Sequence, residues 1–132
     1  MSDQIEIVRR AYQALGQWDV ESLLPDCDPE IELDSFVGQV EGQTYQGHDG
    51  MRRFMSDLAE AWDKWQPVPG HFETAGDTVL ATGTTKVRGK GSGLEIEMRW
   101  GQVFRFRDGK VVWARIYSDP DDARKEYQAL QA

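Results

Sequence analysis

The sequence predicts an α+β fold, in which three to four helices pack on one face of a curved and mostly antiparallel β-sheet. Two observations support this class. Apolar residues recur at helical spacing near both ends of the chain and around residue 55, and long β-forming runs separated by turn residues fill residues 68–118. A chain of 132 residues suits a single domain, which we take to span residues 1–132.

The helices are expected in four places. The first ends at Gly16, after apolar residues at helical spacing (Ile5, Val8, Tyr12 and Leu15). Asp19 can cap a short helix from residue 20 to about residue 24. A third helix should begin near His48 and end at Pro67, with a wide apolar face formed by Met51, Phe54, Met55, Leu58, Trp62 and Trp65. A last helix follows Asp119 or Asp121 and runs to about residue 130.

Five strands are expected, over residues 31–36, 68–74, 78–88, 94–107 and 110–118. A loop rich in glycine, with Gly38, Gly42 and Gly47, should follow the first of them. Asp108-Gly109 is the dipeptide of a two-residue hairpin turn, in which both central residues take positive φ. The last two strands are therefore predicted to form a tight hairpin.

The predicted hairpin places a polar pair inside an aromatic wall. If Arg107 and Lys110 flank the turn, the opposing pairs are Phe106 with Val111, Phe104 with Trp113, Gln102 with Arg115, and Trp100 with Tyr117. Side chains alternate between the faces of a strand, so these eight side chains share one face. A buried guanidinium and a buried amide are costly unless a partner satisfies them. That partner is either a structural carboxylate or a ligand.

Composition excludes several classes of function. The net charge of −8 opposes nucleic-acid binding, which depends on neutralising phosphates. Cys27 is the only cysteine, so the chain has no internal disulfide and no thiolate metal cluster. No apolar run approaches the roughly 18 residues of a membrane span, and the N-terminus lacks a signal-peptide pattern. We expect a cytoplasmic protein that does not bind a membrane.

Four motifs follow one another along the chain: Asp28-Pro29, the segment 45–50 (Tyr-Gln-Gly-His-Asp-Gly), the segment 104–111 (Phe-Arg-Phe-Arg-Asp-Gly-Lys-Val) and Tyr117-Ser118-Asp119. In this order they resemble the nuclear transport factor two-like superfamily, and its SnoaL-like branch in particular. The resemblance covers about residues 3 to 126. It implies a cone-shaped apolar pocket between helices and sheet, frequent dimerisation, and no metal or organic cofactor. It leaves the function open, because the superfamily holds isomerases, epoxide hydrolases, cyclases, dehydratases and non-catalytic binders.

The resemblance to the steroid isomerases of this superfamily implies positions for three polar residues. Their tyrosine falls at Ala11, one residue before Tyr12, and one of their aspartates falls at Gln102, whose amide can also donate to an oxyanion. Their catalytic base falls near Leu33 or Asp34. The apolar alternation in this strand predicts that Asp34 points outward unless a bulge intervenes.

The resemblance to the epoxide hydrolases implies an aspartate at position 115. This chain has Arg115 there, which argues against that activity.

The candidate catalytic residues are Asp34 as general base, with Gln102 and Arg115 stabilising an oxyanion. Arg115 has a structural alternative, an ion pair with Asp34, Glu32 or Glu73. The candidate substrate-binding residues are mostly aromatic: Tyr12, Trp62, Trp100, Phe104, Trp113, Tyr117 and His48. The aromatic residues also suit the core, and His48 also suits a turn or a helix start.

Two hypotheses on function follow. The first is a cofactor-free acid–base enzyme of isomerase, cyclase or dehydratase type, acting on a small apolar carbonyl-bearing or polycyclic compound. The second is a non-catalytic module that binds a small apolar or aromatic molecule.

The outer face of the predicted hairpin indicates a homodimer. Its centre is small and apolar, and its ends are charged, with Arg99, Gly101, Val103 and Arg105 opposite Ser118, Ile116, Ala114 and Val112. A second copy of the chain would cover this centre. The alternative is a solvated sheet with scattered apolar residues.

Overall fold

The computed structural model describes residues 2–36 and 43–131, so most of the predicted glycine-rich loop lies outside the described residues. Six strands form one sheet in the order β2-β1-β6-β5-β4-β3. Only β1 and β6 pair in parallel, and the other neighbours are antiparallel. The strands are β1 (Cys27–Phe36), β2 (Gln43–Gln46), β3 (Trp62–Ala75), β4 (Thr78–Gly89), β5 (Glu95–Arg107) and β6 (Lys110–Tyr117).

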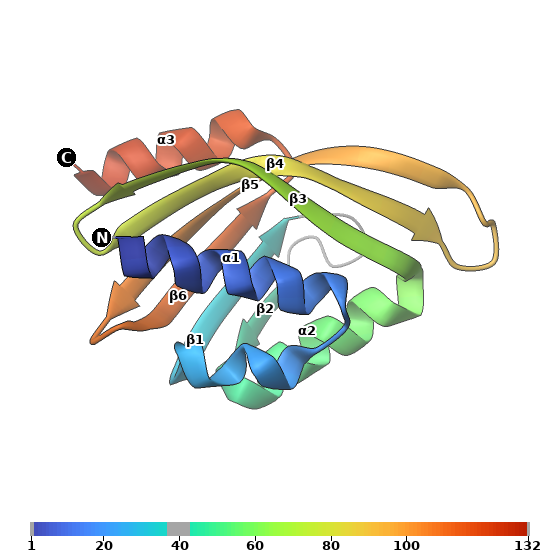
Figure 1. Ribbon diagram of the computed structural model, residues 1–132, viewed down its shortest axis with the longest axis horizontal. Helices are drawn as coiled ribbons and strands as arrows, with labels where there is room; N and C mark the ends of the chain where they lie inside the picture. Colours follow the sequence, from blue (N-terminus) through green and yellow to red (C-terminus); the bar gives the residue numbers. More distant parts are fainter. Residues whose placement is uncertain (1, 37–42, 132) are drawn as a thin grey trace.

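Helices cover both faces of the curved sheet (Figure 1). The helices α1 (Ser2–Gly16) and α2 (Gly47–Ala61) pack against its concave face, where the larger apolar core lies. The helix α3 (Pro120–Gln131) lies on the opposite face over β4, β5 and β6, around a smaller apolar cluster. The predicted α+β class is confirmed, and the placement of α3 corrects the expectation that all helices share one face.

The predicted helix starts and ends are mostly confirmed. The first helix ends at Gly16, and two short 3₁₀ turns follow at Val20–Ser22 and Leu24–Asp26. The Asp19 side chain accepts a hydrogen bond from the backbone N–H of Ser22 at 3.3 Å, as expected of a helix cap. At the start of α3, Asp119 accepts one from the backbone N–H of Asp121 at 2.9 Å.

The third helix is shorter than predicted. It ends at Ala61, and the strand β3 begins at Trp62, so Trp62 and Trp65 do not continue the helical stripe. Trp65 instead lies opposite Val87 in the long β3–β4 ladder. The pairing with β4 outweighs the local helical periodicity, as tertiary contacts often do.

The β5–β6 hairpin has the predicted turn but a different register. Asp108 and Gly109 have φ of 53° and 78°, as the two-residue turn requires. Beyond the turn, Arg105 lies opposite Trp113 and Phe106 opposite Val111, so Val112 is an extra residue in β6. This bulge shifts every later pair by one residue.

The shifted register makes the predicted pairs beyond the bulge wrong. Phe104 lies opposite Ala114, Gln102 opposite Ile116, and Val103 opposite Arg115. A one-residue shift moves a strand's side chains to the other face of the sheet. Ala114 and Ile116 therefore face the concave core, while the side chains of Trp113, Arg115 and Tyr117 face α3.

The helix α3 covers the apolar centre that a second copy was expected to cover. Val103 is fully buried, and Gly101 lies so close to α3 that an added Cβ would stand 2.6 Å from the Cβ of Ala123. The premise that a monomer would expose this centre is therefore wrong. The homodimer itself stays a prediction.

Candidate functional site: an aromatic cavity with one polar pair

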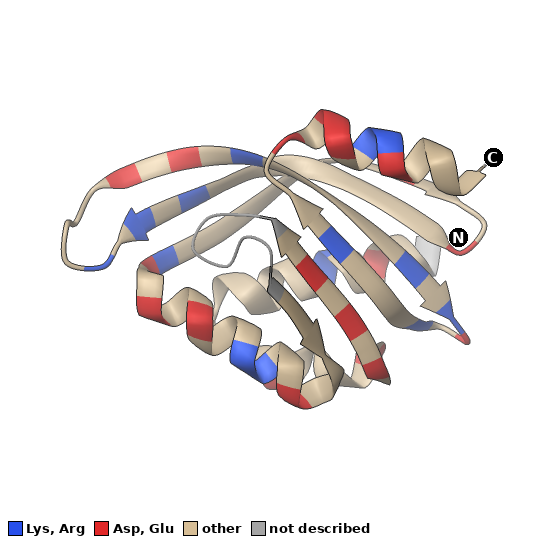
Figure 2. Cartoon of the chain, turned by 180° about the vertical axis from the view of Figure 1, so that it is seen from behind, with Lys and Arg blue, Asp and Glu red and all other residues tan. Residues whose placement is uncertain are grey.

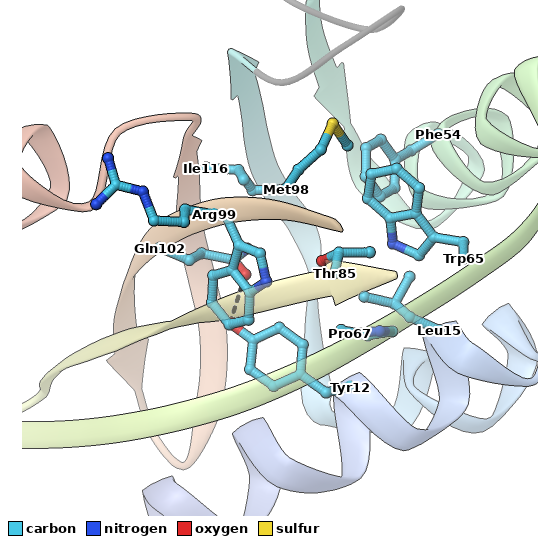
Figure 3. Close-up of a pocket in the computed structure, with 11 residues that line it drawn as sticks. Tyr12, Leu15, Phe54, Trp65, Pro67, Thr85, Met98, Arg99, Gln102 and Ile116 are labelled. Atoms are coloured by element: carbon cyan, nitrogen blue, oxygen red, sulfur yellow. Dashed lines mark hydrogen bonds between the residues drawn. The ribbon is translucent and has the colours of Figure 1, made fainter. Parts of the chain in front are cut away.

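Two small cavities lie inside the cone, with volumes of about 30 Å³ and about 60 Å³. They share part of their lining, namely Tyr12, Leu15, Phe54, Gln102 and Ile116. Residues of β3, β4 and β5 complete the smaller cavity, and Figure 3 labels five of them around Tyr12 and Gln102: Trp65, Pro67, Thr85, Met98 and Arg99. Trp100 of β5 also lines this cavity. A water needs roughly 10–15 Å³ measured in this way, so each cavity holds only a few water-sized groups.

A hydrogen bond between Tyr12 and Gln102 crosses the region that the two cavities share. The Tyr12 hydroxyl donates to Gln102 Oε1 at 2.7 Å, and both side chains are buried (Figure 3). The apolar face of α1 brings Tyr12 inward, where its ring contacts Trp100 and Phe104 at centroid distances of 4.9 Å and 6.2 Å. Burial raises the pKa of the Tyr12 hydroxyl well above its ordinary value, so the hydroxyl stays protonated and able to donate.

The cavity walls offer further hydrogen-bond donors. The indole Nε1 of Trp100 is buried, and no described residue accepts its hydrogen. Gln102 lines both cavities, and its Nε2 is a further donor. A buried donor such as Trp100 Nε1 usually has a partner, which a ligand oxygen or a water can supply.

The described lining supplies no general base near this pair. Neither cavity is lined by a carboxylate or an imidazole among the described residues. Arg99 lines the smaller cavity, but its guanidinium points away from the Tyr12–Gln102 pair (Figure 3). Cys27 lines the larger cavity, and burial, with the nearby charge of Asp26, raises the pKa of its thiol to about 12. The thiol therefore stays protonated at neutral pH.

Asp34 and Arg115 meet on the other face of the sheet. They are neighbours across the parallel β1–β6 pair, and Arg115 Nη2 and Nε lie 3.1 Å and 3.2 Å from Asp34 Oδ2. Arg115 Nη1 also donates to Glu126 Oε1 of α3 at 2.8 Å, and Thr44 donates to Asp34 Oδ1 at 2.9 Å. Of the two interpretations left open for Arg115, the structure shows an ion pair with Asp34.

The charges of the neighbouring strands β1 and β6 match this arrangement. The charged residues of β1 are all acidic and those of its neighbour β6 are basic (Figure 2). Trp113 and Tyr117 belong to the same outer group: the Arg115 guanidinium lies 4.7 Å from the Trp113 ring centroid, and the Tyr117 hydroxyl donates to Glu126 at 3.0 Å. We define Asp34, Arg115, Tyr117 and Glu126 as the outer polar cluster.

The structure therefore separates the three predicted catalytic residues. Gln102 lines the cone, while Asp34 and Arg115 lie in the outer polar cluster. Among the predicted substrate-binding residues, Tyr12, Trp100 and Phe104 line the cavities. Trp113 and Tyr117 lie on the outer face because of the Val112 bulge.

The remaining two predicted residues lie outside the cavity lining. His48 Nε2 lies 3.0 Å from the backbone oxygen of Cys27, which joins the start of α2 to the start of β1. Trp62 packs against Trp65 with ring centroids 6.1 Å apart, and its buried Nε1 has no partner among the described residues.

Sequence reasoning missed several lining residues. Met98 alternates with Trp100 and Gln102 along β5, so the strand pattern already contained the signal for it. Thr85 and Pro67 lie opposite one another in the β3–β4 ladder, and only the assembled sheet brings them to the cavity.

No cluster of three or more His, Cys, Asp and Glu side chains that could hold a metal ion is found within residues 2–36 and 43–131. No helix of these residues is long and apolar enough to cross a membrane.

The fold and the cavity define a class of small α+β proteins with an aromatic-lined cone. The chain belongs to the SnoaL-like domain family, whose model matches residues 8–114. No curated protein matches the sequence.

Solved structures of the same fold cover nearly the whole chain. A protein of unknown function from Burkholderia pseudomallei K96243, described as NTF2-like, has a TM-score of 0.81 at 21% identity, covering 96% of this chain and 98% of that one. An NTF2-like protein from Burkholderia thailandensis E264 has a TM-score of 0.77 at 28% identity, covering 98% of each chain. A putative SnoaL-like polyketide cyclase from Jannaschia sp. CCS1 has a TM-score of 0.77 at 17% identity, covering 97% and 93%. The recognition of the SnoaL-like branch is confirmed.

Proposed function

We propose that the protein binds a small, mostly apolar molecule inside the cone and holds one carbonyl or hydroxyl oxygen of it at Tyr12 and Gln102. The observation that carries this proposal is the buried 2.7 Å hydrogen bond between these side chains, at the point that both cavities share. The Tyr12 hydrogen is donated to Gln102 Oε1, so a ligand oxygen beside the pair can accept a hydrogen bond from Gln102 Nε2, and a ligand hydroxyl can donate to the Tyr12 oxygen. The unpartnered Trp100 Nε1 supplies a second donor in the same wall.

Binding is favoured over acid–base catalysis by the groups that line the cone. Abstracting a proton requires a base within about 3 Å of the reacting atom. The described cavity lining contains donors and aromatic rings, whereas the Asp34 carboxylate is paired with Arg115 on the other face. Donors alone can polarise a carbonyl without taking a proton from its neighbour. We therefore propose a binding protein, with a cofactor-free enzyme as the alternative outcome of the test.

The ligand must displace side chains when it enters. Cavities of about 30 Å³ and about 60 Å³ are much smaller than the 300–1,000 Å³ typical of drug-sized ligands. Met98 lines the smaller cavity and is half-buried, and unbranched methionine side chains adapt readily to new shapes. Small probes are therefore the appropriate first test.

The test compares acetophenone with ethylbenzene, which differ in one carbonyl oxygen. NMR titrations of the full chain would follow the indole N–H of Trp100. We expect acetophenone to bind about tenfold more tightly than ethylbenzene, which corresponds to one buried hydrogen bond of about 1.4 kcal/mol. Q102L should remove this preference. T82V is the matched control, because Thr82 is a buried polar residue of β4 that does not line the described cavities.

A second readout separates binding from catalysis. In D₂O, an enzyme that abstracts α-protons would accelerate deuterium exchange into the methyl group of acetophenone. We expect binding without such exchange. Accelerated exchange that Q102L removes would establish the acid–base alternative, and equal affinity for both probes would contradict the proposed role of the polar pair.

A further inference from the structure

A surface groove of about 580 Å³ runs between α1 and the edge strand β3. Its α1 side is formed by Ile5, Arg9, Tyr12 and Gln13, and its β3 side by Pro67, Pro69 and residues 70–72. This volume lies within the range of small-molecule sites, unlike the cavities inside the cone. The groove is therefore large enough to hold a whole small molecule, whereas the cavities inside the cone are not.

The groove and the cone share a wall. Tyr12 and Pro67 line both the groove and the smaller interior cavity. Tyr12 is held in this wall by its hydrogen bond to Gln102 and by its contact with Trp100. A molecule in the groove would touch the outer side of the same tyrosine ring whose hydroxyl belongs to the interior polar pair.

The guanidinium of Arg9 lies at the groove, and most of its N–H groups have no hydrogen-bond partner in the described chain. The Arg9 guanidinium is 5.1 Å from the Phe72 ring centroid, and its side chain is 54% exposed. It makes one hydrogen bond within the described chain, to Glu6 at 3.4 Å, which is longer than the usual 2.7–3.2 Å. Guanidinium groups carry five donors in a planar fork that matches a carboxylate, so most of the Arg9 donors remain for a ligand.

The other ionisable side chains at the groove already have partners. His71 Nε2 lies 2.9 Å from Glu73 Oε2, and Glu6 is the partner of Arg9. The remaining lining is apolar or uncharged, with the planar ring of Phe72 beside the apolar rings of Pro67 and Pro69. A planar apolar body with one anionic group at its end complements this arrangement.

We propose that the α1–β3 groove binds the anionic end of a planar amphipathic molecule, with Arg9 holding its carboxylate and the rings of Phe72, Pro67 and Pro69 contacting its body. This inference rests on the proposed function where it links the groove to the cone. It adds that the ligand carries a negative charge and that it reaches Tyr12 from the groove. The groove is a second site, so binding in the groove and binding in the cone are tested by separate experiments.

The experiment titrates the full chain, labelled with ¹⁵N, with 2-naphthoate and with the neutral 2-naphthol. We expect naphthoate to shift the backbone amide signals of Arg9, Gly70 and His71 and to bind more tightly than naphthol. R9Q should weaken naphthoate binding about fivefold, as expected for an exposed charge pair. R9K, which keeps the charge and loses the fork, should fall between R9Q and the wild type.

The matched control is R10Q. Arg10 is the next residue of α1 and is similarly exposed, but it pairs with Asp26 at 3.1 Å and does not line the groove. R10Q should bind naphthoate like the wild type. Equal effects of R9Q and R10Q, equal affinities for naphthoate and naphthol, or shifts confined to other parts of the chain would each overturn the groove proposal. Loss of the acetophenone preference in Q102L tests the cone alone, so the two proposals are distinguishable.

Discussion

Gln102 and Arg115 project from opposite faces of the sheet, although they lie on the neighbouring strands β5 and β6. Gln102 is opposite Ile116 and hydrogen-bonds Tyr12 inside the cone, whereas Arg115 is opposite Val103 and binds Asp34 outside it. These polar side chains are thus divided between the interior cavities and a structural cluster.

Arg115 is expected to stabilise the fold. R115L would leave the carboxylates of Asp34 and Glu126 without their cation in a mostly buried place. We expect a loss of about 2–3 kcal/mol in the free energy of unfolding, less than for a fully buried pair because the side chains keep some exposure. Urea denaturation measures it, with R124L as control, since Arg124 pairs with Asp121 on the exposed side of α3. Equal, small losses in both variants would contradict a structural role for the outer polar cluster.

Gly101 is expected to be needed for the docking of α3. In G101A the new Cβ would stand 2.6 Å from the Cβ of Ala123 and 3.0 Å from the Cα of Pro120, so the helix must move. Overpacking of this kind costs about 1–3 kcal/mol. Limited proteolysis should cut α3 faster in G101A than in G76A, the control turn position, where an added Cβ meets nothing within 4 Å. Because Gly76 has φ of +60°, G76A is expected to lose some stability by strain and to keep α3 protected. An unchanged cleavage rate of α3 in G101A would show that the helix tolerates the added methyl group.

The buried Tyr12 hydroxyl predicts a stability difference that depends on pH. Burial raises its pKa in the folded state, so its contribution is fully present below the unfolded value of about 10 and is lost as the pH rises through the folded value. At about pH 8, Y12F should be about 1–2 kcal/mol less stable than the wild type, because Gln102 Oε1 loses its donor. Urea unfolding near pH 11 should show a smaller gap. A gap that stays constant between the two pH values would contradict the raised pKa.

The Cys27 thiol is expected to be unreactive in the folded protein. Burial raises its pKa to about 12, and the thiol donates to the backbone oxygen of Leu23 at 3.4 Å. Because only the thiolate reacts, the native protein near pH 8 should be alkylated by iodoacetamide about a thousandfold more slowly than the urea-unfolded chain. Mass spectrometry of quenched samples measures the rates. Comparable rates in the two states would show that Cys27 is accessible and ionised.

Much of the fold follows from local sequence signals. The Asp108-Gly109 turn, the Asp19 cap and the end of the first helix at Gly16 each depend on one or two residues whose chemistry is specific. The outward direction of Asp34 follows from the alternation of Ile31, Leu33 and Ser35, and the structure confirms it. These signals are local, so the sequence alone contains them.

The register beyond the hairpin turn could not be predicted in the same way. Both alternating sets of β6 contain apolar side chains: Ala114 and Ile116 suit a core face, and so do Trp113 and Tyr117 on either side of Arg115. When both faces can be buried, the hydrophobic pattern does not fix the register. The bulge at Val112 decides it, and that bulge depends on the packing of β6 between β1 and β5. This single residue moves Arg115 out of the predicted site.

The end of α2 shows the same limit. Trp62 and Trp65 continue the helical spacing of the apolar face, so no local signal marks the change at Ala61. The long ladder with β4 determines it, and residues that are far apart in sequence make that ladder. The β3 wall of the cavity could not be predicted for the same reason, because Trp65 and Pro67 form it.

The central claim is that a ligand oxygen lies beside Tyr12 and Gln102 inside the cone. A crystal structure with 4-bromoacetophenone tests it most directly, because the anomalous signal of bromine fixes the position of the ligand. The account predicts bromine among the aromatic residues of the cone and the carbonyl oxygen within about 2.7–3.2 Å of Gln102 Nε2. Bromine located only outside the cone, beside the outer polar cluster or in the α1–β3 groove, would contradict it.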